Sequence, residues 1–553
     1  MTVENRNSEE TLPFAITLDV GSSLNNETGS WRTERPVYVD LLPPCNKQCP
    51  AGENIQEWLY HAEEGRYEDA WREIMVNKPL PAVMGRVCYH TCQTACNRAK
   101  VDEAVGINAI ERFLGDKAIA EGWKVKINVE PTGKKVLVVG SGPSGLSAAY
   151  HLACLGHTVT VRDQGEKPGG MMRYGIPSYR LPREILDAEV GRIADMGVRF
   201  EQGVKVESVD EALKEFDAVF TAVGAQIGKN VNVPAAEASK IMDAVDVLRE
   251  VEEDHEAETG DKPLLGRRVV VYGGGNTAVD AARTAKRLGA TESVILYRRT
   301  RDRMPAHDSE VTEAEEEGIT MRWLSTVDHV DQGTITIEKM ELDENGFPQP
   351  TGEFETLEAD SLIMALGQES DLGLLDGVDG VEIDRGSVKV DGQMMTGRPG
   401  VFAGGDMVPS EKNVTVAIGH GKKAARYIDG WLRGGTYTPP EKHGDADISR
   451  METWYYSDAP QKVREKLEGA RRSSTFDEVV MGLDEDSALF EARRCMSCGN
   501  CFGCDNCFGV CPDNAITKIK PGEYLFKYDY CKGCGVCAEE CPCGAISMVP
   551  EEI

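Results

Sequence analysis

The sequence predicts a multidomain protein in which two α/β Rossmann-like domains lie between cysteine-rich ends. The chain has 553 residues, which at roughly 150 residues per domain corresponds to about three or four domains. Two short apolar strands are each followed by a glycine-rich turn and an alanine-containing helical segment, the order typical of a dinucleotide-binding unit. Of the 17 cysteines, only Cys154 lies outside the segments 45–96 and 495–543.

Composition and charge narrow the possible functions. Hydrophobic residues make up 41% of the chain and the formal net charge is −31. This is a globular composition, and its acidic excess argues against binding to nucleic acids or anionic membranes. No apolar run reaches the roughly 20 residues that span a bilayer. The first ten residues are polar and acidic, unlike a signal peptide. We therefore expect a cytoplasmic protein.

The N-terminal part predicts a partly extended arm and then a helical domain. Residues 1–44 are polar, whereas residues 53–75 place apolar side chains at helical spacing. In a reducing compartment, a dense array of cysteines indicates metal or redox chemistry rather than disulfides. The five cysteines here, an awkward number for clusters of four ligands, are Cys45, Cys49, Cys88, Cys92 and Cys96.

The first glycine motif consists of Gly140, Gly142 and Gly145, directly after the apolar strand 135–139. Its glycines permit a tight turn and bring the backbone close to a pyrophosphate at the N-terminus of the following helix. Asp163 ends the next strand about 20 residues later, where a carboxylate binds a ribose hydroxyl. The alternative is a glycine-rich turn that holds no ligand.

The second motif follows the strand 268–272 and has the variant form Gly-x-Gly-x-x-Ala. Its next strand ends in Arg298 and Arg299 without a carboxylate, and arginine at this point suits the 2′-phosphate of NADPH. The alternative is that these arginines form a solvated edge, so NADH stays possible. Between the two strands, residues 243–261 are acidic and expected to be exposed. The candidate nucleotide contacts in this motif are Gly273, Gly275, Asn276 and Thr277.

A third segment completes the pattern of a flavin site. Residues 396–406 contain a short apolar strand and end in Asp406, and residues 414–425 have a helical pattern. This arrangement looks like the returning half of an FAD domain, with Asp406 on the ribityl chain. The first motif then binds FAD and the second a nicotinamide. No Cys-x2-Cys follows the first motif, which argues against a dithiol reductase.

At this point the chain resembles flavoproteins with two dinucleotide-binding domains. Residues 168–182 (PGGMMRYGIPSYRLP) and 297–306 (YRRTRDRMPA) are similar to the small subunit of glutamate synthase. That family inserts its nicotinamide domain into its FAD domain. The resemblance also implies that Gly170 belongs to the cofactor site.

The C-terminal cysteines form two runs of Cys-x2-Cys-x2-Cys-x3-Cys-Pro. This doubled spacing predicts a bacterial-type α+β ferredoxin domain with two [4Fe–4S] clusters, in which each cluster takes three thiolates from one run and the fourth from the other. A pair of zinc ribbons is the alternative, which the Cys-Pro endings disfavour. One cluster takes Cys501, Cys504, Cys507 and Cys541. The other takes Cys531, Cys534, Cys537 and Cys511.

The N-terminal cysteines are interpreted through the family resemblance. In glutamate synthase small subunits and dihydropyrimidine dehydrogenase, an Arg-Cys-x2-Cys-Gly motif precedes the Cys-x3-Cys-Pro of the helical domain. Here the motif is absent before Cys45 and stands at residues 494–499. The resemblance thus implies that the two chain ends meet and share one [4Fe–4S] cluster. Its ligands would be Cys45, Cys96, Cys495 and Cys498.

A second N-terminal cluster would take Cys49, Cys88, Cys92 and a ligand other than cysteine. The family analogy places that ligand within residues 106–111, and we assign it to Glu111. Two alternatives stay open: Glu111 is a helix-surface acid, or the helical domain holds a single cluster.

A further resemblance joins both ends of the chain. Residues 28–37 and 528–552 are similar to the delta, ferredoxin-like subunit of 2-oxoacid:acceptor oxidoreductases. The expected division is a 1–44 arm, a 45–130 helical Fe–S domain, a 131–262 first FAD part, a 263–385 NAD(P) domain, a 386–440 second FAD part, a 441–490 linker and a 491–553 ferredoxin domain.

Together these parts predict an NAD(P)H:acceptor oxidoreductase with FAD and four [4Fe–4S] clusters, and no catalytic acid or base. Nicotinamides transfer two electrons together, whereas Fe–S clusters accept one electron each. A flavin can do both, so the FAD must lie between the nicotinamide and the clusters. The leading partner is a 2-oxoacid:acceptor oxidoreductase; dissimilatory sulfite reductase and a glutamate synthase large subunit are alternatives. A hypothesis of another class is a cluster-bearing scaffold that carries electrons without using nicotinamide.

Overall fold

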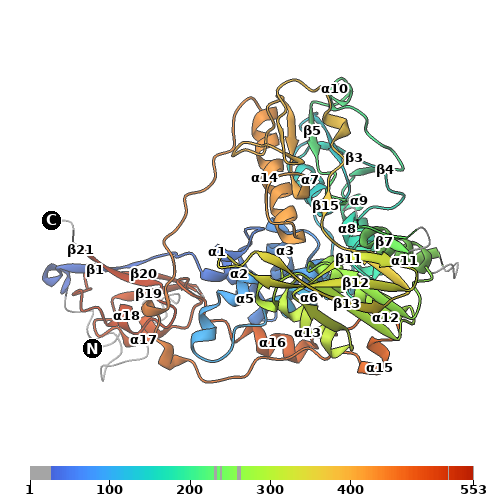
Figure 1. Ribbon diagram of the computed structural model, residues 1–553. Coiled ribbons are helices and arrows are strands. Elements are labelled where there is room, and N and C mark those ends of the chain that lie inside the picture. The colour runs from blue at the N-terminus through green and yellow to red at the C-terminus, as the bar shows by residue number, and fades with distance from the viewer. Residues whose placement is uncertain (1–26, 230–232, 237–239, 258–262, 521, 552–553) are drawn as a thin grey trace.

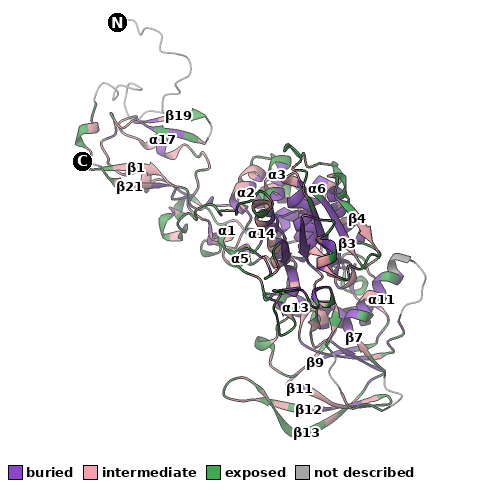
Figure 2. Ribbon diagram, turned by 90° about the horizontal axis from the view of Figure 1, so that it is seen from above, coloured by how far each residue is buried: buried purple, intermediate pink, exposed green. Residues whose placement is uncertain are grey.

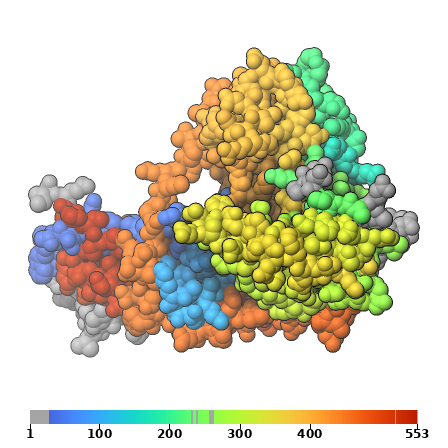
Figure 3. Space-filling view, in the orientation of Figure 1, coloured from blue at the N-terminus to red at the C-terminus, as the bar shows by residue number. Residues whose placement is uncertain are grey.

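The computed structural model describes residues 27–551 except 230–232, 237–239, 258–262 and 521. Figure 1 shows a large body that contains helices and β-sheets, with a smaller lobe beside it. In Figure 3 the first described residues, in blue, and the last, in red, are packed together in this lobe. Most of the buried residues lie in the body (Figure 2). In the described part of the chain, no helix has the length and apolar character to cross a membrane.

The N-terminal helical domain packs around two buried tryptophans, Trp58 and Trp71. The helical spacing predicted for residues 53–75 corresponds to two helices, and Ile55, Leu59 and Ile74 are fully or almost fully buried on their inner faces. The helices of this domain are α1 (Pro44–Gln48), α2 (Ile55–Glu63), α3 (Tyr67–Asn77), α4 (Pro81–Val87), α5 (Thr91–Thr94) and α6 (Ile107–Ala120).

The first sheet is parallel, and its strands come from two distant parts of the chain. Its order is β18-β5-β2-β3-β4. Because β18 pairs with β5 across about 180 residues of intervening chain, a second unit is inserted into the first. The elements are β2 (Lys135–Val139), α7 (Pro143–Cys154), β3 (Thr158–Asp163), α9 (Arg183–Asp195), β4 (Arg199–Gln202), β5 (Ala218–Thr221), β18 (Val401–Ala403) and α14 (Val414–Leu432).

The inserted unit has its own parallel sheet, in the order β10-β9-β8-β14-β7, and an antiparallel sheet β11-β12-β13. Its elements are β7 (Ile241–Asp243), α11 (Ala244–Ala257), β8 (Arg268–Tyr272), α12 (Asn276–Arg287), β9 (Glu292–Tyr297), α13 (Asp308–Glu316), β10 (Thr320–Trp323), β11 (Ser325–Asp331), β12 (Thr334–Leu342), β13 (Pro348–Glu358) and β14 (Ser361–Met364).

Two expectations about this unit differ from the structure. The acidic segment 243–261 is not simply exposed, because its described part forms α11 and buries Val247, Leu248 and Val251. The boundary expected at residue 262 also lies elsewhere, because β7 already pairs with the second sheet. The expectation was wrong because the many acidic residues of α11 hid its amphipathic pattern: the helix has an apolar inner face and an acidic outer face.

The smaller lobe is built from both ends of the chain. Strand β1 (Glu34–Tyr38) pairs antiparallel with β21 (Ile546–Pro550), and Arg32 donates from Nη2 to Glu551 Oε1 at 2.9 Å. The described part of the predicted N-terminal arm is therefore a strand of the ferredoxin-like lobe; residues 1–26 lie outside the described residues. The other elements of the lobe are α17 (Asn506–Val510), β19 (Ile516–Lys520), β20 (Glu523–Phe526) and α18 (Val536–Glu539).

The expected linker 441–490 is an ordered strap along the body. It contains α15 (Gly469–Arg472) and leads into α16 (Glu485–Ala492), which packs on α2 and α6. Arg464 Nη1 donates to Gly85 O at 3.1 Å, and Val479 N donates to Tyr179 O at 2.9 Å. The strap thus contacts both the helical domain and the first α/β unit.

Replacing Arg32 with alanine should destabilise the ferredoxin-like lobe. Arg32 also donates from Nη1 to Cys531 O at 3.0 Å. A hydrogen bond that involves a charged group contributes about 1.5–3 kcal/mol to the stability of the folded state. We expect the free energy of unfolding to fall by about 1–3 kcal/mol, measured by urea unfolding followed by circular dichroism. Arg268→Ala, which removes an exposed ion pair to Glu358, is the control and should cost below about 1 kcal/mol. Equal effects would contradict the assigned role of Arg32.

Candidate functional site

A cavity of about 770 Å³ lies between the two α/β units and is lined by both glycine motifs. Of the predicted nucleotide-binding residues, Gly145 alone does not line it, because it lies inside the first turn of α7. The predicted residues that line this cavity are Gly140, Gly142, Asp163, Gly170, Gly273, Gly275, Asn276, Thr277, Arg298, Arg299 and Asp406.

The first turn requires glycine for steric reasons. Gly140 has φ +102°, and a Cβ there would lie 2.3 Å from Ala222 O. A Cβ on Gly145 would lie 1.9 Å from Gly140 O. The turn therefore closes directly onto α7, whose N-terminal N–H groups face the cavity side and suit a phosphate.

Asp163 ends β3 and is hydrogen-bonded to the same turn. Its Oδ2 accepts from Ser141 N at 2.6 Å and its Oδ1 accepts from Gly165 N at 2.7 Å. A carboxylate offers about four acceptor positions. Asp163 can therefore anchor the turn and still accept a hydrogen bond from the hydroxyl group of a ribose in the cavity.

The second turn is equally tight, and it contacts the N-terminal helical domain. A Cβ on Gly273 would lie 2.2 Å from Ala365 O. Asn276 begins α12; its Oδ1 accepts from His307 N at 2.9 Å, and its Nδ2 lies 2.5 Å from Tyr89 Oη. The Tyr89 ring stacks on His307 with centroids 4.9 Å apart. Sequence reasoning missed Tyr89, because nothing local links residue 89 to a turn almost 190 residues later.

The arginines after β9 divide between the cavity and the surface. Arg298 and Arg299 line the cavity. Arg301 instead pairs with Asp308 at 3.0 Å and with Glu315 at 2.7 Å on the exposed side. Two cavity arginines with no carboxylate at the strand end fit a phosphate on the ribose.

Asp406 lies at the opposite wall of the cavity, next to the N-terminus of α14. Burial raises the pKa of its carboxyl group. Val414 and Ala417 of α14 also line the cavity. The other face of this helix contacts the cysteine loops: Thr415 Oγ1 donates to Cys88 Sγ at 3.2 Å, and Lys422 Nζ donates to Gly52 O at 3.0 Å.

The four cysteines predicted to share a cluster come together from both ends of the chain. Cys45, Cys96, Cys495 and Cys498 line one small, mostly apolar cavity. Gln56 Nε2 donates to Ser497 Oγ at 2.6 Å and holds the 495–498 loop against α2. Burial raises the pKa of the Cys45 thiol, and the neighbouring Cys495, Cys96 and Cys498 raise it further. A cluster with four thiolate ligands fits this donor set.

The second N-terminal set contains charged groups that the sequence did not reveal. Glu111 is only 2% exposed, so it is not a helix-surface acid. Its Oε1 lies 2.8 Å from Lys78 Nζ, which lies 2.7 Å from Glu53 Oε2. The Cys49 thiol points at the same Glu53 oxygen at 3.6 Å. Cys88 and Cys92 lie near enough for Lys78 to lower their thiol pKa values, although burial raises them more strongly.

In the lobe, the cysteines of the two predicted cluster sets lie near one another. Burial raises the pKa values of Cys501, Cys504 and Cys507, and Cys541 raises all three further. Burial likewise raises the pKa of Cys537, and Cys511, Cys531, Cys507 and Cys534 raise it further, so its charged neighbours come from both predicted sets. Cys543, which has no predicted role, lies with its Sγ 3.8 Å from Cys541 Sγ.

Among the described residues, no three His, Cys, Asp or Glu side chains converge on a point that could hold a single metal ion. A [4Fe–4S] cluster needs a different arrangement, since its four thiolates bind four separate irons around a cube. At the meeting point of the chain ends, four cysteines line one cavity.

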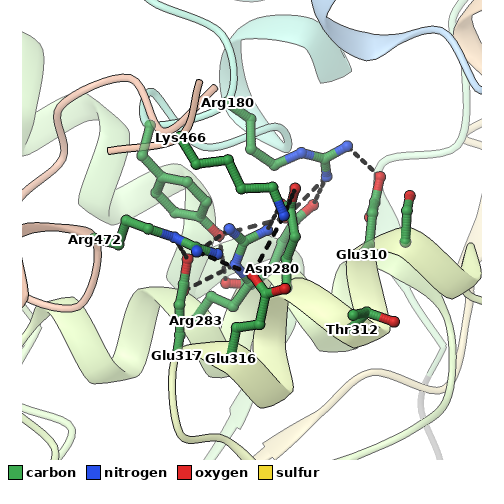
Figure 4. A network of polar contacts seen from close by, with 12 residues as sticks. Arg180, Asp280, Arg283, Glu310, Thr312, Glu316, Glu317, Lys466 and Arg472 are labelled. Carbon is green, nitrogen blue, oxygen red and sulfur yellow. Dashed lines mark hydrogen bonds and ion pairs between the residues drawn. The ribbon is translucent and has the colours of Figure 1, made fainter. Parts of the chain in front are cut away.

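A buried ionic network joins the two α/β units and the strap (Figure 4). Arg180 of the first unit lies 2.7 Å from Asp280 of α12 and also pairs with Glu310 of α13. Arg283 pairs with Glu317 at 2.7 Å, and Arg472 of the strap pairs with Glu316 at 3.0 Å. Separating the two partners of a buried ion pair would leave each charge uncompensated, which is energetically costly. The network therefore fixes the relative position of the two units that form the walls of the cavity.

With this geometry, the family can be stated. Residues 134–421 match the family model described as pyridine nucleotide-disulphide oxidoreductase. The chain belongs to this family and is an oxidoreductase. Residues 24–123 match the model described as dihydropyrimidine dehydrogenase domain II, 4Fe-4S cluster, and residues 524–547 match a 4Fe-4S binding domain. The predicted fold class, with iron–sulfur domains at both ends, is confirmed.

Three relatives share most of their length with this chain. It is 35% identical to the NADP(+)-dependent formate dehydrogenase subunit beta of Moorella thermoacetica, over 83% of this chain and 71% of the relative. It is 34% identical to the NADPH-Fe(3+) oxidoreductase subunit beta of Geobacter sulfurreducens, over 83% and 76%. It is also 34% identical to the glutamate synthase [NADPH] small chain of Azospirillum brasilense, over 72% and 88%. The predicted resemblance to the glutamate synthase small subunit is thus confirmed.

Two glycine variants should separate folding from cofactor binding. Gly145→Ala places a Cβ 1.9 Å from Gly140 O, whereas Gly142→Ala meets no atom closer than 4.0 Å. We expect Gly145→Ala to lower the melting temperature and abolish flavin binding. Gly142→Ala should keep the melting temperature of the flavin-free protein and only weaken flavin binding, because its methyl group faces the pyrophosphate position. Full flavin retention in both variants, measured by absorbance per chain, would contradict the site.

Proposed function

We propose that this protein is an electron-transfer subunit that takes electrons from NADPH and passes them through FAD and four [4Fe–4S] clusters to a partner oxidoreductase. The observation that carries the proposal is one cavity lined by both dinucleotide motifs and connected through α14 to the cysteine loops. The intact second motif and its two arginines favour nicotinamide use over a scaffold that only carries electrons. A cytoplasmic location stays a prediction.

The residues of the chain act mainly by position. Asp163, Gly140 and Asp406 would hold the FAD, while Asn276, Arg298 and their neighbours would hold the nucleotide that delivers hydride. FAD, when bound, accepts two electrons together and releases them singly, which links nicotinamide to iron–sulfur chemistry. The walls must place the two rings within about 3–3.5 Å, and the Arg180–Asp280 contact at 2.7 Å between the units supports a fixed separation.

The packing favours one order of clusters. The set of Cys49, Cys88, Cys92 and Glu111 comes first, because Thr415 of the cavity helix contacts Cys88. The shared set follows through the adjacent loops. Cys498 of the shared set is separated by two residues from Cys501 of the first lobe cluster, so electrons would pass next into the lobe. Cys504 and Cys534 are exposed there, which favours the lobe as the exit to a partner.

The partner is proposed from two sources. The similarity of residues 28–37 and 528–552 to the delta subunit of 2-oxoacid:acceptor oxidoreductases favours such an enzyme, and the pairing of β1 with β21 supports treating those two segments as one module. Dissimilatory sulfite reductase and a glutamate synthase large subunit are the alternatives. Two relatives are named as beta subunits, which supports the proposal that this chain also acts as one subunit of a complex. Purification of the native complex would identify the partner.

The double variant Arg298→Ala/Arg299→Ala tests the nucleotide preference. Loss of charge-assisted hydrogen bonds, at about 1.5–3 kcal/mol, should lower kcat/KM for NADPH by about 10- to 100-fold in anaerobic dye reduction. The value for NADH should stay nearly unchanged. Arg301→Ala is the control, because Arg301 pairs with surface acids. No change with either nucleotide would point to the solvated-edge alternative, and an equal loss with both would point to a distorted site; either result would contradict the proposed preference.

The double variant Cys495→Ser/Cys498→Ser tests the shared cluster. Anaerobically purified wild-type protein should hold about sixteen iron atoms, four in each of four clusters. The variant should lose about four and retain its flavin and both lobe clusters. Cys154→Ser, which changes a thiol outside the predicted sets, should lose none. An iron content of about twelve or about eight in the wild-type protein, which corresponds to one N-terminal cluster or none, would contradict the proposal of two N-terminal clusters.

A further inference from the structure

Lys78 is a buried ammonium group between two buried carboxylates. It is 2% exposed, and Glu53 and Glu111 are 4% and 2% exposed. Its Nζ lies 2.7 Å from Glu53 Oε2 and 2.8 Å from Glu111 Oε1. Lys78 follows α3 directly, whereas Glu53 lies before α2 and Glu111 lies in α6. Three separate segments thus bring one positive and two negative charges to a single point.

The same point faces the cysteines of the second N-terminal set. The Cys49 thiol lies 3.6 Å from Glu53 Oε2, and Lys78 influences Cys49, Cys88 and Cys92 electrostatically. Glu53 Oε1 is buried and has no hydrogen-bond partner among the residues that the structure describes. A second cation nearby is Lys422 of α14, whose Nζ is already bonded to the backbone carbonyls of Ala51 and Gly52. Lys78 is therefore the cation that faces the carboxylates.

Stability does not explain this arrangement. Desolvation of buried charges commonly costs as much as their attraction returns, and apolar replacements of buried ion pairs are often neutral or stabilising. The charges do have a consequence for electron transfer. A reduced cluster carries one more negative charge than an oxidised one, and the reduction potential depends on the surrounding charges and hydrogen bonds. An ammonium beside the cluster favours the reduced form, and a carboxylate disfavours it.

We propose that Lys78 is a positioning residue that raises the reduction potential of the cluster held by Cys49, Cys88 and Cys92, and that Glu53 opposes it. This inference rests on the proposed second N-terminal cluster and deepens it. The Lys78 ammonium also lies 2.8 Å from Glu111 Oε1, and this contact would hold in place the carboxylate that we assign as the fourth ligand.

The test uses opposite changes of charge in the full chain. Lys78→Met should lower the potential of this cluster, and Glu53→Gln should raise it, each by at least a tenfold change in the one-electron equilibrium, or about 59 mV. The double variant should return close to the wild-type value. Potentials are read from the EPR signals during an anaerobic redox titration, alongside iron content. Lys47→Met is the matched control, because Lys47 lies between Cys45 and Cys49 but is exposed and pairs with Asp445.

The outcomes separate this inference from the proposed function. If the wild-type protein shows only three clusters by iron content and EPR, the proposed function and this inference both fail at this site. If it shows four, but the two single variants leave every potential unchanged or shift it in the same direction, the role of Lys78 is overturned while the cluster count stands. If Lys78→Met loses iron, the test rests on Glu53→Gln alone. If the reduction potential of this cluster does not rise in Glu53→Gln, the inference is overturned.

Discussion

The close packing of α14 between the cavity and the cysteine loops is the constraint on which the electron path depends. A Cβ on Gly421 would lie 2.2 Å from Ser144 O of α7, and one on Gly419 would lie 2.4 Å from Pro50 O. Only glycine permits both contacts. One helix therefore touches α7, which begins at the first glycine motif, on one side and the loop after Cys49 on the other.

A second constraint is topological. The strand pair β1–β21 closes the lobe with residues from both chain ends, and the shared cysteine set lies where the chain enters the body and leaves it. The flavoprotein body is thus inserted into the lobe in the same way that the second α/β unit is inserted into the first. The strap, with Arg472 and Val479 in contact with the body, fixes the relative position of these nested parts.

Local patterns account for most of what could be predicted. Gly140, Gly145 and Gly273 were identified because tight turns restrict residue type at the turn itself. The assignment of the lobe cysteines to two cluster sets stays a prediction from their spacing. Residues 243–261 were misjudged because the acidic residues outweigh the few apolar residues that form the buried face of α11. Tyr89, Glu53 and Lys78 were missed because each acts on a residue from another segment.

By itself, the sequence determined the strands, the glycine turns and the cysteine spacings, since these depend on neighbours within about 30 residues. Family resemblance added the expectation that the chain ends meet. Only the tertiary structure decided which side chains share a cavity. It placed Arg298 inside and Arg301 outside, buried Glu111 against Lys78, and turned the linker into a strap. The physical reason is that burial and charge pairing depend on packing between segments distant in the chain, which periodicity and spacing do not encode.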